Sequence, residues 1–322
     1  LIQWFDENKR SLPWRDTGNP YDVWLSEIML QQTRIEAVKP KYLAFKKELP
    51  DIASLANCDD DRLMRLWEGL GYYSRARNLK KCAIYLMEHY DGKLPDNFEL
   101  LKKLPGIGPY TAGAIASIAF NLPAPAIDGN VLRVLTRYYG IIEDIRLPKV
   151  KKMIEEKLND FYSCKQPNLS YASFNQGIME LGETVCVPNG APQCTKCPLN
   201  KNCYAYQNQM TDRIPYRSSL KDRKILERTL FIIRDDQSFL IHKRPQEGLL
   251  AGLYEFPGVD AHLTKSETIS HIESLGFTPL RITTLPEAKH IFTHLEWHMR
   301  AYEIKVAEIQ HPLDEHYYLV NK

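Results

Sequence analysis

The first part of the chain carries apolar residues at helical spacing. They include Leu25, Ile28, Met29 and Ile35 in one stretch and Leu63, Leu66 and Leu70 in another. Proline and glycine separate these stretches by short connections, and no long alternation of apolar and polar residues interrupts them. The sequence therefore predicts a mainly helical domain over residues 1–206.

The pattern changes after this helical part. Residues 207–228 are polar and rich in charge, among them Asp212, Arg213, Arg217 and Lys221, which predicts an interdomain linker. Beyond it, apolar runs at 229–233 and 239–242 flank a polar turn and predict a β-hairpin. A helical stretch at 265–275 and β-rich runs at 282–285, 297–306 and 317–320 then predict an α+β domain over residues 229–322.

Length and composition agree with two folded domains. A chain of 322 residues with 44% hydrophobic and 25% charged residues is neither disordered, collagen-like nor a coiled coil. No apolar run approaches the length of about 18 residues that a membrane-spanning helix needs, so we expect no membrane association. The formal net charge of +2 neither favours nor excludes a nucleic-acid partner. The chain begins with Leu1, so a preceding targeting segment is left open.

Four of the seven cysteines lie within one short stretch. Cys186, Cys194, Cys197 and Cys203 follow the spacing C-x7-C-x2-C-x5-C. An odd total without secretory features argues against a disulfide framework and favours metal ligation. Zinc sites usually combine two close cysteine pairs, whereas four thiolates in so tight a loop suit a [4Fe–4S] cluster. The spacing alone leaves both metals open.

A glycine-rich turn interrupts the helical pattern near residues 101–118. Gly106 and Gly108 are followed by Pro109, which is favoured at the first position of a helix. Such a helix-hairpin-helix directs backbone N–H groups outward, where they can bind a DNA phosphate without a basic side chain. A packing turn between two helices is the alternative for the motif in isolation.

Two carboxylates stand in settings that suit catalysis. Glu27 lies among apolar residues on a predicted helix, where burial would raise its pKa and favour proton donation. Asp128 lies just before the predicted helix at 131–139. Alternatively, the first is a solvated helix charge and the second an ordinary helix cap. One protonated and one ionised carboxyl group are what cleavage of a glycosidic bond requires.

Together, the hairpin, the aspartate that follows it and the cysteine loop resemble the endonuclease III superfamily of DNA glycosylases. Within that superfamily, the segments 12–15, 26–33, 68–75 and 128–131 are similar to the MutY-type adenine DNA glycosylases. The resemblance covers nearly the whole chain. It implies a monomer that flips adenine out of double-stranded DNA containing A:8-oxoguanine or A:G mispairs and leaves an abasic site. It also implies a [4Fe–4S] cofactor on the four clustered cysteines.

The resemblance assigns roles to individual residues. Glu27 would protonate the departing adenine, and Asp128 would stabilise the sugar cation or its covalent adduct. Supporting roles would fall to Tyr110 and Asn130 beside these carboxylates, to Gln176 at the flipped base, to Gln32 and Tyr72 inside the duplex, and to Gly106 and Gly108 at the DNA backbone. Packing or surface roles are the duller alternatives for the tyrosines and glutamines.

The second domain resembles the Nudix-like domain of the same family. Residues 259–263 carry no glutamate-rich metal-binding box, so we expect lesion reading rather than hydrolysis. Phe292, Thr293 and His294 are similar to the family's Phe-Ser-His reader of 8-oxoguanine, with threonine replacing serine. A second departure is the spacing of seven residues between Cys186 and Cys194, where the family usually has six. We expect the extra residue near Asn189 and Gly190 to be accommodated in a turn.

Three rival interpretations can be compared with the same residues. A glycosylase/lyase would have lysine in place of Tyr110, because tyrosine cannot form a Schiff base. A thymine-mismatch glycosylase would lack the 26–33 segment and the second domain. A non-catalytic iron–sulfur protein that binds DNA or senses redox state would leave Glu27 and Asp128 unexplained. We expect a location near the nucleoid in the cytoplasm if the source is bacterial, and in the nucleus or mitochondrion if it is eukaryotic.

Overall fold

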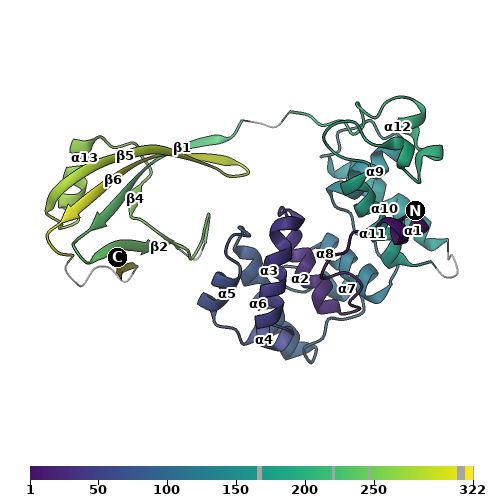
Figure 1. Ribbon diagram of the computed structural model, residues 1–322, viewed down its shortest axis with the longest axis horizontal. Coiled ribbons are helices and arrows are strands. Elements are labelled where there is room, and N and C mark those ends of the chain that lie inside the picture. Colours follow the sequence, from purple (N-terminus) through teal and green to yellow (C-terminus); the bar gives the residue numbers. More distant parts are fainter. Residues whose placement is uncertain (165–168, 220–221, 246, 310–315, 322) are drawn as a thin grey trace. The chain divides into compact units, whose positions relative to one another are not determined.

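The computed structural model describes residues 1–322 except 165–168, 220–221, 246, 310–315 and 322. It divides the chain into two compact units, Leu1–Ser218 and Ser219–Lys322, coloured from purple to green and from green to yellow in Figure 1. The linker predicted at 207–228 is therefore too long. Ile214 is buried in the first unit, and the amide of Ile145 donates a 3.1 Å hydrogen bond to the carbonyl of Tyr216. Strand β1 already begins at Lys224, and linker residues 220 and 221, including Lys221, lie outside the described residues.

The first unit is helical, as its apolar spacing predicts. Side-chain oxygens cap the N-termini of several helices, for example Asn19 before α2 and Ser170 before α11. None of the described helices is long and apolar enough to cross a membrane. The helices are α1 (Ile2–Asn8), α2 (Pro20–Leu30), α3 (Ile35–Glu48), α4 (Ile52–Ala56), α5 (Asp60–Leu66), α6 (Ser74–His89), α7 (Phe98–Leu101), α8 (Pro109–Ala114) with a π-helical continuation (Ile115–Ala119), α9 (Gly129–Tyr139), α10 (Pro148–Ser163), α11 (Tyr171–Thr184) and α12 (Tyr204–Gln207).

Two separate hydrophobic cores hold this unit together. The first is built from α2 to α8 around Trp24, Phe45 and Trp67. The second is built from α9, α10 and α11. Helix α1 belongs to the second core although it begins the chain, and it lies beside α11 (Figure 1). Gly177 of α11 packs closely against this helix, because a Cβ there would lie 3.3 Å from Leu1 Cγ and from Phe5 Cβ.

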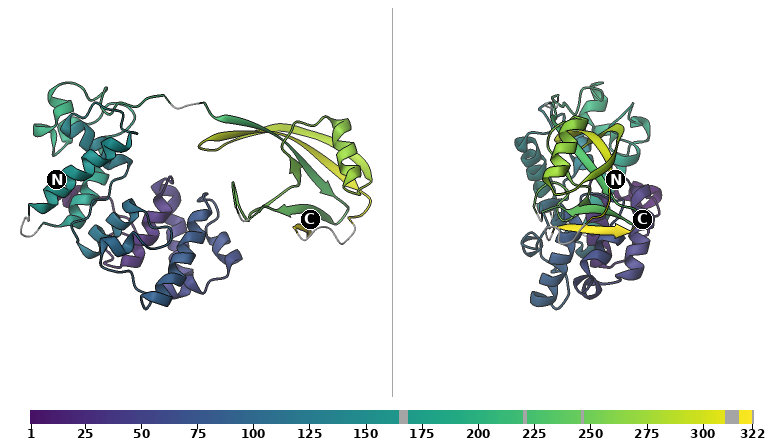
Figure 2. Two further views of the ribbon diagram at one scale, coloured as in Figure 1. Left: turned by 180° about the vertical axis from the view of Figure 1, so that it is seen from behind. Right: turned by 90° about the vertical axis from the view of Figure 1, so that its left-hand side faces the viewer.

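The second unit is a mixed sheet with one helix. Strands β1 and β6 run parallel, while the other pairings are antiparallel. The predicted hairpin is confirmed, since Arg234 of β1 pairs with Phe239 of β2. Helix α13 packs on the sheet through Ile272 (Figure 2). The elements are β1 (Lys224–Arg234), β2 (Ser238–Lys243), β3 (Tyr254–Glu255), β4 (Gly258–Val259), α13 (Lys265–Ser274), β5 (Pro279–Ile291), β6 (Leu295–Val306) and β7 (Tyr317–Asn321), with the sheet order β3-β2-β1-β6-β5, β4 beside β1 and β7 beside β2.

Candidate active site

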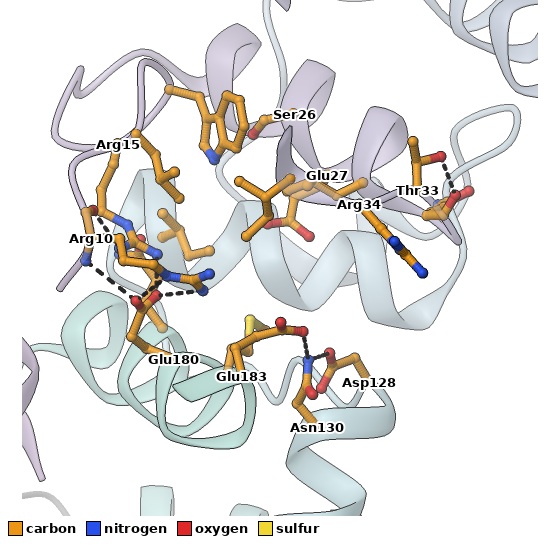
Figure 3. Close-up of a pocket in the computed structure, with 18 of the residues that line it drawn as sticks. Arg10, Arg15, Ser26, Glu27, Thr33, Arg34, Asp128, Asn130, Glu180 and Glu183 are labelled. Carbon is orange, nitrogen blue, oxygen red and sulfur yellow. Dashed lines mark hydrogen bonds and ion pairs between the residues drawn. The ribbon is translucent and has the colours of Figure 1, made fainter. Parts of the chain in front are cut away.

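A cleft of about 940 Å³ lies in the first unit and is lined by residues of both helical cores. Figure 3 shows its walls, with α2 on one side and the start of α9 on the other. Most of the predicted catalytic and base-reading residues meet here. They are Glu27, Gln32, Tyr110, Asp128, Asn130 and Gln176.

Glu27 projects from α2 into this cleft (Figure 3). The helix buries residues on nearly all its sides, which leaves Glu27 only 8% exposed. Burial raises the pKa of Glu27 to about 7, and the nearby charge of Asp128 adds to the rise, while Tyr110 and Arg15 oppose it. A carboxyl group with this pKa keeps a substantial protonated fraction at neutral pH, which is what a general acid needs. The burial predicted from the sequence is confirmed.

Tyr110 holds the Glu27 carboxyl group in place. It stands in the first turn of α8, and its hydroxyl donates a 2.5 Å hydrogen bond to Glu27 Oε2. Burial and the neighbouring carboxylates raise the pKa of Tyr110 well above its usual value, so the phenol remains a donor. Gly113 lets α8 pack against the backbone at Pro125, because a Cβ there would stand 2.0 Å from the Pro125 carbonyl oxygen.

Asp128 both caps α9 and faces the cleft. Its Oδ1 accepts a 2.7 Å hydrogen bond from the amide of Val131, and its Oδ2 accepts one of 2.8 Å from Asn130 Nδ2. Burial raises the pKa of Asp128, while these hydrogen bonds and the charge of Arg133 oppose the rise. The structural and the functional interpretation are therefore compatible, because capping fixes the orientation of a carboxylate that still lines the cleft.

Asn130 connects Asp128 to α11. Its Nδ2 also donates to Glu183 Oε1 at 3.0 Å, and its Oδ1 accepts a 2.7 Å hydrogen bond from Arg133. Gly182 allows α11 to approach, since a Cβ there would lie 2.6 Å from Asn130 Cβ. The side chain of Asn130 is thus fixed on three sides, as Figure 3 shows for its bonds to Asp128 and Glu183.

The structure adds an ion-pair cluster to the predicted site residues. Glu180 is buried and binds Arg10 Nε at 2.5 Å and Arg15 Nη2 at 2.9 Å in the wall of the cleft. Burial would raise the pKa of Glu180, but the two guanidinium groups hold this pKa below its usual value. A sequence signal for this wall exists, because Gln176, Glu180 and Glu183 recur on one face of α11.

Gln32 and Tyr72 stand at the tips of two neighbouring loops. Both are exposed and have left-handed backbones, with φ values of 53° and 46°. Of the two, only Gln32 lines the cleft. A left-handed conformation is uncommon for residues other than glycine, so contacts with the rest of the unit must stabilise the backbone of these two loops.

The buried side chain of Arg75 fastens the two loops together. It donates hydrogen bonds of 2.8 Å to the carbonyls of Gln31 and Leu70, one from each loop. The same guanidinium also donates to Ile28 and Met29 at the end of α2, at 2.8 and 3.0 Å. Arg75 therefore links both tips to the helix that carries Glu27.

The helix-hairpin-helix turn has the predicted form. Gly106 adopts a φ of +73°, and a Cβ there would lie 2.7 Å from Asn78 Cβ, so this position requires glycine. Gly108 precedes α8 as its N-cap and has no atom within 4 Å of the position of a Cβ. This open space in front of the helix N-terminus leaves room for a phosphate.

The four clustered cysteines line a single hollow next to Arg137. Arg137 Nη1 donates a 3.2 Å hydrogen bond to Cys186 Sγ. Among the described residues, no three His, Cys, Asp or Glu side chains are spaced to hold one metal ion. Gly190 has a φ of +77°, which places a turn where the extra loop residue is expected.

Phe292, Thr293 and His294 lie in the second unit, at the turn between β5 and β6. The amide of Phe292 donates a 2.9 Å hydrogen bond to the carbonyl of Leu295, which closes the turn. The Phe292 ring packs edge-on against the buried Trp297, with ring centres 4.8 Å apart. Phe292 therefore anchors the turn, and the exposed residues Thr293 and His294 form its tip.

Two family models match the chain. Residues 25–163 match the HhH-GPD superfamily of base excision DNA repair proteins, and residues 228–321 match the NUDIX domain. Two solved structures share the fold of the helical unit. A thermostable thymine-DNA glycosylase is 28% identical with a TM-score of 0.57, covering 64% of this chain and 93% of its own. Endonuclease III in a non-covalent DNA complex is 23% identical with a TM-score of 0.53, covering 65% of this chain and 94% of its own.

Curated relatives extend over both units. The adenine DNA glycosylase of Buchnera aphidicola (subsp. Baizongia pistaciae) is 34% identical over 297 residues, which are 92% of this chain and 82% of that protein. The adenine DNA glycosylase of Mus musculus is 33% identical over 364 aligned residues, covering 94% of this chain and 69% of that protein. The MutY-type resemblance is thereby confirmed, and the chain, a DNA glycosylase of the helix-hairpin-helix type, belongs to the adenine DNA glycosylase family.

Proposed function

We propose that this protein removes adenine from double-stranded DNA in which adenine is paired with 8-oxoguanine or guanine. The observation that carries the proposal is the meeting of Glu27 and Asp128 in one cleft, each held by its own hydrogen-bond donor. Two carboxyl groups with different environments supply both an acid and a stabilising charge. Relatives named for adenine excision match both units, whereas the thymine-DNA glycosylase covers only 64% of the chain.

In this mechanism Glu27 donates its proton to the departing adenine. Protonation neutralises the negative charge that the base would otherwise carry as it leaves, and the pKa of about 7 allows this near neutral pH. Asp128 in its ionised form stabilises the positive charge that develops on the sugar, and a water molecule then attacks C1′ to give the abasic site. Tyr110 orients the acid, and Asn130 orients the stabilising carboxylate.

We expect the product to be an intact abasic site. A lyase activity needs an amine that forms a Schiff base with the opened sugar. No lysine is found among the described residues that line the cleft, and Tyr110 cannot supply an amine. Borohydride reduction should therefore trap little covalent complex. Efficient trapping that disappears when one lysine is replaced would contradict this part of the proposal.

The cysteine loop would hold a [4Fe–4S] cluster through Cys186, Cys194, Cys197 and Cys203. Such a cluster has no open ligand position here, so it would supply rigidity to the loop rather than chemistry to the base. Protein purified without oxygen should contain about four irons and four labile sulfides per chain, as a four-iron cluster requires. Stoichiometric zinc would overturn the assignment.

The turn at Thr293 and His294 would read the base opposite adenine. 8-Oxoguanine differs from guanine by an oxygen at C8 and a proton at N7, so only well-placed polar groups can tell them apart. A hydroxyl and an imidazole at an exposed tip can provide such contacts, each worth about 1–3 kcal/mol of discrimination. Phe292 would act indirectly by anchoring the tip on Trp297.

Single-turnover excision on a set of duplexes tests the proposal. Adenine is placed opposite 8-oxoguanine, guanine, cytosine and thymine, and further duplexes carry thymine or uracil opposite guanine. We expect adenine to be released fastest opposite 8-oxoguanine and more slowly opposite guanine. Release of thymine or uracil in place of adenine would refute the assigned substrate.

A double variant tests the reading turn separately. Replacing Thr293 and His294 by alanine should lower the preference for 8-oxoguanine over guanine about tenfold or more, which corresponds to about 1.4 kcal/mol. The matched control replaces Asp236 and Gln237, which form the exposed turn between β1 and β2 of the same unit. An unchanged preference in a folded double variant would assign residues 293 and 294 to structure alone.

A further inference from the structure

A second pocket, of about 460 Å³, lies on the helical unit and shares no lining residue with the cleft. It forms where the segment that follows the cysteine loop runs past α9. Its charged lining consists of Arg133, Arg137, Arg213, Arg217 and Asp212. Four guanidinium groups thus face one carboxylate, and the glycosylase mechanism uses none of the residues at the pocket's mouth.

The floor of the pocket is rigid. Arg133 and Arg137 are only 4% and 6% exposed. Arg137 Nε donates a 2.7 Å hydrogen bond to the carbonyl of Ile214, and its Nη2 donates one of 3.0 Å to Thr211. These bonds fix the backbone of the segment that carries the other two arginines, so the four positive charges are held near one another.

The mouth of the pocket carries charge without a partner. Arg213 and Arg217 are exposed, and within the described parts of the chain neither guanidinium group makes an ion pair or a hydrogen bond. Their side chains are therefore available, and the buried arginines beneath them add to the positive potential. Guanidinium groups bind phosphate through paired, charge-assisted hydrogen bonds, which makes a phosphate the anion that fits this arrangement best.

We propose that this pocket binds a backbone phosphate of the DNA, at a site separate from the helix-hairpin-helix turn. Helix α9 gives its position, because Asp128 caps the helix and Arg137 lies in its last turn. Nine residues at a helical rise of about 1.5 Å separate the two by about 14 Å. One DNA strand advances about 3.4 Å per nucleotide, so the bound phosphate lies within about four nucleotides of the excised base.

The proposal requires DNA binding but not the mispair specificity proposed above. The test compares the full chain with an Arg213→Ala/Arg217→Ala variant in duplex binding at increasing salt concentrations. Each lost phosphate contact lowers the slope of log K against log salt by about 0.9. Because one phosphate contact is lost, we expect the slope to fall by about 1 and the affinity at 0.1 M salt to fall about tenfold. Arg213→Lys/Arg217→Lys should keep most of the slope.

The control is Lys47→Ala/Lys151→Ala, which removes the same net charge from exposed positions on α3 and α10. It should leave the slope close to that of the parent. A second arm uses duplexes with one neutral methylphosphonate placed at successive positions within four nucleotides of the adenine. At one of these positions the methylphosphonate should lower the salt slope of the parent to that of the arginine variant. The same duplex should leave the salt slope of the arginine variant unchanged.

Titration with inorganic pyrophosphate distinguishes the sources of phosphate. If the arginine variant loses pyrophosphate binding but keeps its DNA slope, the occupant is a small phosphate-bearing molecule and the assignment to DNA is overturned. If neither measurement separates the variant from the control, the pocket binds no phosphate and the whole proposal fails. Release of thymine instead of adenine would refute the proposed substrate while leaving the slope comparison intact.

Discussion

Replacing Glu27 by glutamine should abolish excision and at the same time make the protein more stable at alkaline pH. Glutamine has the same shape as glutamate but cannot donate the proton, so the single-turnover rate should fall at least about 100-fold. The stability effect comes from burial, which raises the pKa of Glu27 from 4.5 to about 7. The active site thus holds a group whose charged form the fold disfavours.

The sign and size of the stability effect follow from proton linkage. Between pH 4.5 and about 7 the folded protein retains a proton on Glu27 that the unfolded chain has lost. Stability therefore falls as pH rises through this window, by about 1.4 kcal/mol per pH unit for one proton. From pH 5.5 to pH 8 the parent should lose about 2 kcal/mol relative to Glu27→Gln, which has no such proton to lose.

Urea unfolding followed by the helical circular dichroism signal measures this difference at both pH values. Ser26→Ala is the control, since Ser26 is a neighbouring buried residue on α2 that does not titrate in this range. Its effect on the free energy of unfolding should be the same at pH 5.5 and pH 8. Parallel pH profiles for the parent and Glu27→Gln would refute the raised pKa. Excision by Glu27→Gln within a few-fold of the parent would remove Glu27 as the acid.

Three further variants test how the site is held. Tyr110→Phe removes a hydrogen bond that lowers the pKa of Glu27, so the alkaline limb of the excision rate should move to higher pH, and a shift to lower pH would contradict the role of that bond. Gly113→Ala places a methyl group 2.0 Å from the Pro125 carbonyl oxygen and should lower the thermal midpoint, with a cost of about 1–3 kcal/mol; an unchanged midpoint would mean that α8 can shift freely. Arg75→Met leaves buried carbonyls unpaired and should slow excision and weaken lesion binding together, with partial rescue in Arg75→Lys; normal lesion binding would show that the two loops need no such clamp.

The local features of this protein can be recognised from its sequence alone. Helical spacing, capping residues and the glycine-rich turn act over a few neighbouring residues, so they can be recognised without a fold. Gly106 is an example, because the turn that its neighbours predict contains a left-handed backbone position, which glycine adopts readily. The apolar neighbours of Glu27 along α2 likewise indicated its burial, which the structure confirms. The resemblance then assigned roles to residues whose local patterns alone were ambiguous.

Features that depend on contacts between distant residues could not be predicted from local patterns. Glu180 is buried against Arg10, which lies 170 positions earlier in the chain, so no local pattern could pair them. The predicted linker is too long for a related reason. The residues around Ile214 are charged and look like a linker, but the carbonyl of Ile214 accepts a hydrogen bond from Arg137, far away in the chain. The clamp made by Arg75 likewise joins carbonyls up to 47 positions away. Such groups meet because packing of the two cores brings their helices together, and the cost of burying each polar group is offset by a partner that only the complete fold supplies.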